Sequence, residues 1–370
     1  MLLVVLGGLL AAEHRGRPST AADSLPGQRT LLLALRGPAG QGVAALLLGA
    51  DAATGQADGL LIPSSVMVDP AAAAAMPFGR TVGLAGRTAA SAALTDLLGV
   101  RVQSQWALTP ASLAGLVDRL GGVTVSVDRD VVQTGTSGVQ TVVVPVGRAR
   151  IDGAQAAAYA AYLAPGEPEA ARLARFGQVI DAVLLALPTS PAAAAAVLAP
   201  ATVAGASSVR VDHLASLLVT AASEDRAGRI TYSVLPTRPI DTGGAALATG
   251  LDQSAASVLV QGMFAGSLLS PPGQPAVRVL VESAPGEGPA VLAARSRLIG
   301  AGYRFVNGST TGSAPLQSLV LVPDASAGSL AVGRRVATTL HLPASAVQVS
   351  AQGQDIAGVV VVIGVDFPGG

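Results

Sequence analysis

Short apolar runs alternate with segments of helical periodicity along most of the chain. Thr30–Leu35 and Val43–Leu48 are apolar runs of strand length, whereas Ala89–Leu98 and Arg172–Leu187 have the length and pattern of helices. Interleaved strands and helices bury their apolar surfaces together, with helices packed on a sheet. After the first twelve residues, no run approaches the roughly 18 apolar residues of a membrane-spanning helix. The pattern therefore predicts an α/β or α+β fold.

The composition excludes several classes of protein. Hydrophobic residues make up 50% of the 370 residues, so a sizeable core is available. The 23 basic and 23 acidic residues cancel, and no basic run or aromatic-interleaved patch suggests nucleic-acid binding. The chain has no cysteine and three histidines, which excludes disulfides and thiolate metal sites and argues against a histidine-rich metal site.

The first twelve residues, Met1–Ala12, are apolar and precede Arg15 and Arg17. Twelve residues are too few to cross a bilayer, and no basic flank of a signal peptide precedes them. We interpret the segment as part of a membrane anchor, with a degenerate signal peptide or a buried strand or helix as alternatives. Residues 1–28 are expected to comprise this segment and a linker.

Length and linker composition predict the domain organisation. At roughly 100–200 residues per domain, the chain corresponds to two or three units. Residues 269–276, Leu-Ser-Pro-Pro-Gly-Gln-Pro-Ala, are expected to link two domains. They separate a larger domain at residues 29–268 from a small α/β domain at residues 277–370. Within the larger domain, residues 236–250 are expected to form a loop containing Gly, Thr and Pro.

Five segments, in order, resemble the LytR–CpsA–Psr family of cell-envelope proteins. The two most specific are L-V-D-R-L-G-G-V-T-V at Leu116–Val125 and D-G-A-Q-A-A-A-Y at Asp152–Tyr159. They are similar to the family patterns L-V-D-x-L-G-G-V-x-V and D-G-x-Q-A-L-x-Y. The other three are the strand Thr30–Arg36, the hairpin Leu48–Pro63 and the helix segment Arg172–Gln178. Residues 277–367 resemble the LytR C-terminal domain that often follows.

The resemblance implies a fold, a reaction and a location. The family fold is a mixed sheet flanked by helices, with an apolar pocket for a lipid tail. Active members transfer polyprenyl-diphosphate-linked glycopolymers to peptidoglycan, generally with a divalent metal such as Mg²⁺. The expected partners are therefore a polyprenyl-linked glycopolymer or peptidoglycan and the membrane, and no nucleic acid. The expected location is the extracytoplasmic face of the cell membrane.

Several charged positions of the family pattern are neutral in this chain. Val43 stands in the segment that aligns with the family motif S-D-T, whose Asp serves the metal. Ser64 and Ser65 align with the Arg-Asp of I-P-R-D, and Ala161 and Leu163 align with an Arg-x-Arg pair. Losing one charge-assisted contact typically costs about 1.5–3 kcal/mol. The substitutions therefore predict eroded catalysis, and no bound cofactor is expected here.

Two arginines of the family pattern persist. Arg172 and Arg175 are predicted to bind the diphosphate, because the planar guanidinium binds phosphate oxygens in a bidentate manner. Their alternative role is structural. Three residues apart on a helix, they could instead form ion pairs with Glu167 or Glu169.

Three functions are compatible with these residues. The first is a family member with degenerate catalytic residues that binds lipid-linked polymer or peptidoglycan, or assists an active paralogue. The second is a working transferase whose lost residues have substitutes, for which the candidates are Asp51, Asp58, Asp69, Arg80 and Arg87. The third is a structural or interaction module of the envelope. Convergence of carboxylates and at least three arginines on one pocket would favour the second.

Overall fold

The computed structural model describes residues 27–71, 75–84, 88–135, 138–240, 248–269, 277–284, 286–308, 314–350 and 357–368. Every helix in these ranges is too short or too polar to span a bilayer. Met1–Ala12 and, apart from Leu269, the linker at 269–276 lie outside the described residues. Their interpretation stays a prediction.

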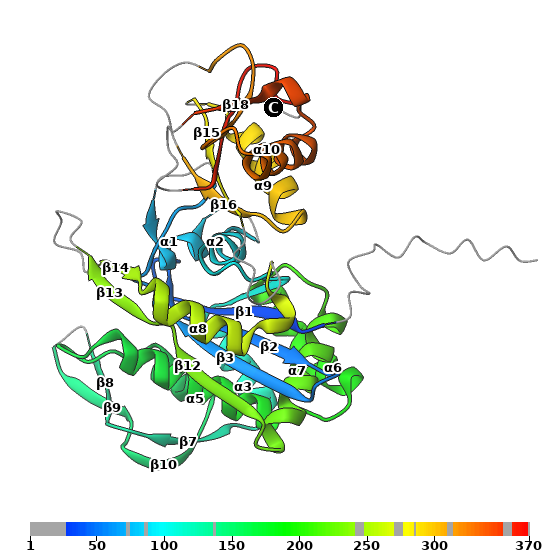
Figure 1. Cartoon of the computed structure of the whole chain (residues 1–370). Helices are drawn as coiled ribbons and strands as arrows, with labels where there is room; N and C mark the ends of the chain where they lie inside the picture. Colours follow the sequence, from blue (N-terminus) through cyan, green and yellow to red (C-terminus); the bar gives the residue numbers. More distant parts are fainter. Residues whose placement is uncertain are drawn as a thin grey trace, which may run out of the picture.

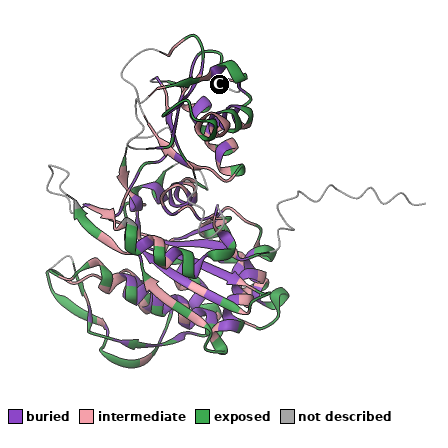
Figure 2. Ribbon diagram, in the orientation of Figure 1, coloured by how far each residue is buried: buried purple, intermediate pink, exposed green. Residues whose placement is uncertain are grey.

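A six-stranded mixed sheet forms the centre of the larger part of the molecule (Figure 1). Its strands, in spatial order, are β11 (Ala206–Ser207), β6 (Ser104–Leu108), β1 (Arg29–Arg36), β2 (Gly42–Asp51), β3 (Gln56–Ile62) and β12 (Ile230–Val234). β2 is antiparallel to β1 and β3, whereas β6 and β12 run parallel to β1 and β3. β1 and β2 are buried along nearly their whole length (Figure 2), as expected for strands covered on both faces.

Helices cover both faces of this sheet. The larger core lies against α3 (Pro110–Arg119), α4 (Gly153–Ala161), α5 (Glu169–Ala186), α6 (Pro191–Ala204) and α7 (Val211–Arg226). The opposite core lies against α1 (Phe78–Gly83), α2 (Ala89–Leu98) and α8 (Gln253–Met263), with the short 3-10 helix η1 (Ala265–Ser267) after α8. The predicted class, a mixed sheet flanked by helices, is confirmed.

Local sequence signals define the ends of several helices. Thr109 caps α3 and forms a reciprocal capping box with Ser112. Asp152 caps α4 in the same way with Gln155. Gly99 ends α2 in the left-handed conformation, with φ of 69°, which glycine adopts at little cost. These boundaries therefore follow from residues within one turn of each end.

Four short two-stranded ribbons surround the main sheet. They are β4 (Met67–Val68) with β5 (Met76–Pro77), β7 (Val123–Val127) with β10 (Gly147–Ile151), β8 (Val131–Thr134) with β9 (Gln140–Val144), and β13 (Thr237–Ile240) with β14 (Ala248–Leu251). The last ribbon corrects the prediction of a loop at residues 236–250. Its strands lack an alternating apolar pattern, and backbone pairing holds them together, including a bond from the Thr249 N–H to the Ser65 carbonyl.

Residues after 277 form a second sheet. Its order is β16 (Arg304–Asn307), β15 (Arg278–Glu282), β19 (Val359–Val362), β17 (Leu319–Val322) and β18 (Val347–Val349). α9 (Gly288–Gly300) and α10 (Ala327–Leu340) pack on one face, and η2 (Ala344–Ala346) precedes β18. The Arg295 guanidinium of α9 binds the Asp96 carboxylate of α2 at 2.7 and 2.9 Å, and this ion pair connects the two helices. The domain limits and the LytR type of residues 277–370 stay predictions.

Candidate functional site

The two serines at the end of β3 form a polar corner with α5. The Ser64 N–H donates to Glu169 Oε1 at 2.7 Å, and the Ser64 hydroxyl donates to the same oxygen. The Ser65 hydroxyl donates to Glu169 Oε2 at 2.7 Å and lies 3.2 Å from Thr249 Oγ1. The carboxylate therefore accepts hydrogen bonds from both residues at the family's Arg-Asp position.

Arg172 completes this corner. Its Nη2 lies 3.2 Å from Glu169 Oε1, and its side chain is 15% exposed. Arg172 Nε is buried, and no hydrogen-bond partner for it occurs in the described parts of the chain. Burial raises the pKa of Glu169, but hydrogen bonds from Ser64 and Ser65 and the charge of Arg172 outweigh it and lower that pKa overall. The corner is thus an ionised carboxylate beside a guanidinium whose buried Nε has no partner among the described residues.

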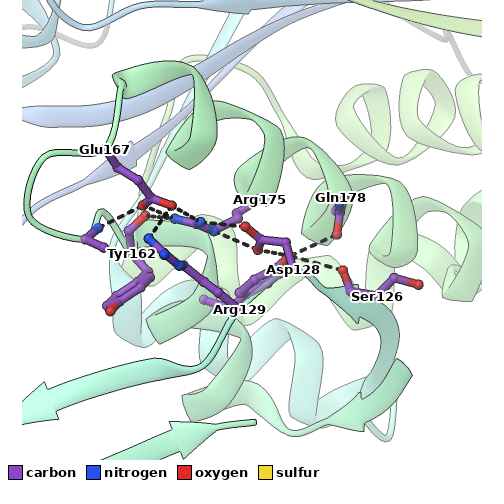
Figure 3. A network of polar contacts seen from close by, with 9 residues as sticks. Ser126, Asp128, Arg129, Tyr162, Glu167, Arg175 and Gln178 are labelled. Atoms are coloured by element: carbon purple, nitrogen blue, oxygen red, sulfur yellow. Dashed lines mark hydrogen bonds and ion pairs between the residues drawn. The ribbon is translucent and has the colours of Figure 1, made fainter. Parts of the chain in front are cut away.

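Arg175 belongs to a different network, deeper beneath α5 (Figure 3). Its side chain is 1% exposed. Its Nε and Nη2 donate to the Asp128 carboxylate at 2.9 and 2.6 Å. Its Nη1 and Nη2 donate to the Glu167 carboxylate at 2.8 and 2.6 Å, and Nη1 also donates to the Tyr162 carbonyl at 3.1 Å. These contacts engage all five N–H groups of the guanidinium.

The network extends through charge and hydroxyl contacts. The Tyr159 hydroxyl lies 3.1 Å from Asp128 Oδ1 and 3.0 Å from Gln178 Oε1, and Arg129 binds Glu167 at 2.8 Å. Hydrogen bonds from Arg175 lower the pKa of Glu167 to about 2 and also lower the pKa of Asp128. Burial, together with the Asp128 charge, raises the pKa of Tyr159 to about 12. All three groups therefore keep one protonation state at neutral pH.

The two predicted diphosphate ligands thus lie on one helix in different surroundings. Both ion pairs of the alternative role are formed, Arg172 with Glu169 and Arg175 with Glu167. Arg172 retains an unpaired N–H at the corner, whereas Arg175 is saturated by protein acceptors. Diphosphate binding by these residues stays a prediction, and the geometry favours Arg172 as the one to contact a ligand.

The other substituted positions, Val43, Ala161 and Leu163, are half-buried and aliphatic. Ala45 pairs with Ile62 in the antiparallel strands β2 and β3. Val43 and Ser64 each lie two residues beyond this pair, at the same end of the two strands. Val43 is half-buried against the main core, as is Ala161 at the end of α4. Leu163, also half-buried, follows directly after Tyr162, whose carbonyl binds Arg175. Aliphatic side chains at these three positions provide no ligand for a cation or an anion.

The candidates for a substitute catalytic site are dispersed. Asp51 pairs with Gln56 at the start of β3, roughly 20 Å by strand rise from Ile62 at its other end, which precedes the Ser64 corner. Asp58 lies mid-strand, where burial raises its pKa to about 6. Asp69 contacts Asn307 near the second sheet, and Arg80 is exposed on α1. Arg87 lies outside the described residues.

Carboxylates do not gather into a metal-binding group in the ranges the structure describes, where no cluster of three or more His, Asp or Glu occurs. Glu169 is the acidic residue at the corner, and sequence reasoning treated it only as a structural partner of the arginines. Asp128 and Thr249 were missed altogether. Asp128 is 47 residues from Arg175, and Thr249 is 184 residues from Ser65, so local patterns carry no signal for either contact.

Known structures share this architecture. B. subtilis TagV is 12% identical, with a TM-score of 0.53 over 65% of this chain and 98% of that chain. B. subtilis TagT is 18% identical, with a TM-score of 0.53 over 68% and 95%. Protein gbs0355 from Streptococcus agalactiae is 17% identical, with a TM-score of 0.55 over 64% and 87%. At these identities the likeness establishes the fold.

Sequence comparison gives one family match. No curated protein matches the chain. The model of the LytR–CpsA–Psr family matches residues 71–190, which include α3, β7, α4 and the arginine-bearing start of α5. The matched region therefore contains both specific motifs and both retained arginines. Residues 71–190 therefore match the LytR–CpsA–Psr family model, within a fold that the chain shares with these solved structures.

Proposed function

We propose that this protein is a non-catalytic or weakly catalytic family member that binds the phosphate head of a polyprenyl-linked glycopolymer. The observation that carries the proposal is the corner of Ser64, Ser65, Glu169 and Arg172. Its carboxylate is already hydrogen-bonded by both serines, while the buried Nε of Arg172 has no partner in the described parts of the chain. A single guanidinium can bind an oxyanion, but it cannot supply the several charges that phosphoryl transfer requires.

The side chains at the corner do not form a suitable set of ligands for Mg²⁺. That ion demands near-octahedral oxygen ligands at roughly 2.0–2.1 Å. Glu169 is the carboxylate at hand, and its oxygens face two serines and a guanidinium. Val43 stands where the family pattern has its metal-serving Asp and has no oxygen in its side chain. These features support binding that does not depend on a divalent metal.

The proposal includes a location and partners. As a member of an envelope family, the protein is proposed to act at the extracytoplasmic face of the cell membrane, with Met1–Ala12 contributing to an anchor. Peptidoglycan and an active paralogue are its proposed partners. Residues 277–370 are proposed to be a LytR-type C-terminal domain, whose α9 contacts α2 through Arg295.

A binding experiment tests the head-group proposal. Polyprenyl phosphate in detergent micelles should bind the full chain with equal affinity in Mg²⁺ and in EDTA. Arg172→Ala should weaken that binding about tenfold, since a charge-assisted hydrogen bond contributes about 1.5–3 kcal/mol. Arg210→Ala is the matched control, because Arg210 is 81% exposed and pairs with Asp212 on another helix.

A transfer assay supplies the opposing outcome. Lipid-diphosphate-linked donor, peptidoglycan and Mg²⁺ should give little product beside an active family member. Metal-dependent turnover at a comparable rate would instead establish a working transferase. Failure of wild type to bind polyprenyl phosphate at all would leave the structural-module function.

A further inference from the structure

A second polar site lies away from the serine corner, between the β7–β10 ribbon and α5. The structure has a cavity of about 710 Å³ there, within the usual size range of small-molecule sites. One wall is formed by β7 and β10, and the other by the second half of α5. In Figure 1 these elements lie at the end of the molecule remote from the second sheet. Arg172 and Ser64 are not part of the lining.

The ribbon wall carries two arginines in register with two hydroxyls. Arg148 is opposite Ser126, and Arg150 is opposite Thr124. All four residues are exposed, whereas Val123, Val125 and Val127 of the same strand point into the core. Side chains two residues apart on a strand share a face and lie roughly 7 Å apart. The ribbon therefore presents a row of guanidinium and hydroxyl groups to the cavity.

One of these arginines is held in position. The Nε and Nη2 of Arg150 donate to the Gly121 carbonyl at 3.1 and 2.6 Å. Gly121 and Gly122 have φ of 76° and 89°, and a Cβ at Gly122 would lie 2.9 Å from the Ile151 carbonyl oxygen. The double glycine thus allows the turn that fixes Arg150, and its remaining N–H groups are donors for a ligand.

The α5 wall adds one amide and an aliphatic surface. Gln178 Oε1 is engaged by the Tyr159 hydroxyl, and its amide nitrogen carries two further donors. Leu185 and Ala186 line the cavity and are exposed. Asp181 also lines it, but this carboxyl is hydrogen-bonded to Asp225 of α7. The cavity is lined by two arginines, Arg148 and Arg150, and one carboxylate, Asp181, so its net charge is positive.

We propose that this cavity binds a segment of an anionic glycan, a sugar chain bearing phosphate or carboxylate groups. Oxyanions spaced along such a chain match the two arginines, sugar hydroxyls match Thr124, Ser126 and Gln178, and the C–H faces of sugar rings match Leu185 and Ala186. The glycan identity rests on the proposed function above. The positive cavity itself rests on the residues that line it.

The test uses the full chain and tetragalacturonate, a carboxylated tetrasaccharide, with neutral maltotetraose as its counterpart. Calorimetry should show binding of tetragalacturonate, weaker at high salt, and at least tenfold weaker binding of maltotetraose. Arg148→Gln should weaken tetragalacturonate binding about tenfold, since it removes a charge-assisted contact. Ala186→Glu, an exposed substitution that places a negative charge at the cavity, should weaken it at least as much.

Controls separate this site from the serine corner. Arg148→Gln and Ala186→Glu should leave polyprenyl phosphate affinity unchanged, and Arg172→Ala should leave tetragalacturonate affinity unchanged. Arg210→Gln, outside the cavity, should alter neither. Unchanged tetragalacturonate binding in both cavity variants would overturn the proposal. Equal affinity for maltotetraose would also overturn it. Loss of tetragalacturonate binding in millimolar inorganic phosphate would overturn it as well, because that result would indicate a simple oxyanion site. Loss of polyprenyl phosphate binding by wild type alone would overturn only the head-group proposal.

Discussion

Arg175 is the residue on which the polar contacts beneath α5 depend. It is almost completely buried between two carboxylates, and its ring-stacking contact with Tyr162 places the guanidinium 5.3 Å from the ring centre. Removing one partner of a buried ion pair is strongly destabilising because the other charges lose their counter-ion. The network therefore serves mainly to fix α5 against β7, and with it the position of Arg172.

Arg175→Ala should lower the free energy of unfolding by about 3 kcal/mol or more. Arg172→Ala, three residues away on the same helix, should lower it by only about 1 kcal/mol, because it loses a single local ion pair. Urea denaturation followed by circular dichroism measures both. Equal and small losses would show that the buried network contributes little to stability.

The same network makes stability depend on pH. The pKa of Glu167 is lowered from 4.5 to about 2 by hydrogen bonds from Arg175. A carboxyl whose pKa is lower in the folded state stabilises the fold above the unfolded pKa and loses that contribution as pH falls through the folded pKa. The unfolding free energy should therefore fall between about pH 4.5 and pH 2. Glu167→Gln should be less stable at pH 7 and should show a shallower decline in this window. An identical slope in the variant would exclude Glu167 as its source.

At the scale of elements, the crossing of α3 and α4 depends on one glycine. Gly153 is buried at the start of α4, where its N–H donates to Asp118 of α3 at 2.7 Å. A Cβ at this position would lie 2.1 Å from the Ala114 carbonyl oxygen of α3, so the helix backbones would have to separate. The D-G pair of the family motif is thus a cap followed by a close backbone approach.

Gly153→Ala should destabilise the protein by about 1–3 kcal/mol through this overpacking. Gly115→Ala is the matched control within α3, because a Cβ there has no atom within 4 Å in the described structure. It should stabilise the helix by about 0.5–1 kcal/mol, since alanine has the higher helix propensity. Thermal unfolding of the two variants should shift in opposite directions, and parallel shifts would contradict the steric account.

At the scale of the whole molecule, a buried ion pair joins the second sheet to the first. Arg295 of α9 binds both oxygens of Asp96 and the Ala92 carbonyl of α2, with side chains 15% and 8% exposed. Arg304 donates to the Leu97 carbonyl and Asn307 to the Pro70 carbonyl across the same boundary. These directional contacts hold α9 and β16 against α2 and the Pro70 segment.

Arg295→Ala should loosen this junction, because it leaves Asp96 buried without its counter-ion. Amide hydrogen exchange in α2 and α9 should accelerate, while exchange in β1 and β2 stays slow. Arg334→Ala, an exposed change on α10, is the control and should leave all four elements unchanged. Uniformly faster exchange throughout the variant would indicate global destabilisation instead of a local junction.

Local patterns in the sequence were sufficient for the class of fold and for most elements. Apolar runs predicted β1 and β2, and the capping residues Thr109 and Asp152 stand at the positions where α3 and α4 begin. The reason is that backbone dihedrals and cap hydrogen bonds are satisfied within a few residues. The family, too, was recognised from contiguous motifs. The ribbon β13–β14 was not predicted, because its two strands have no periodic apolar pattern in the sequence.

Contacts between distant residues were decided only by the tertiary arrangement. The sheet order brings Ser64 to Glu169, 105 residues away, and the packing of β7 on α5 brings Asp128 to Arg175. Either arginine could have met a phosphate or a carboxylate, since the guanidinium binds both in the same geometry. Which acceptor it meets depends on burial and on the carboxylates that the fold places beside it, and these follow from how whole elements pack.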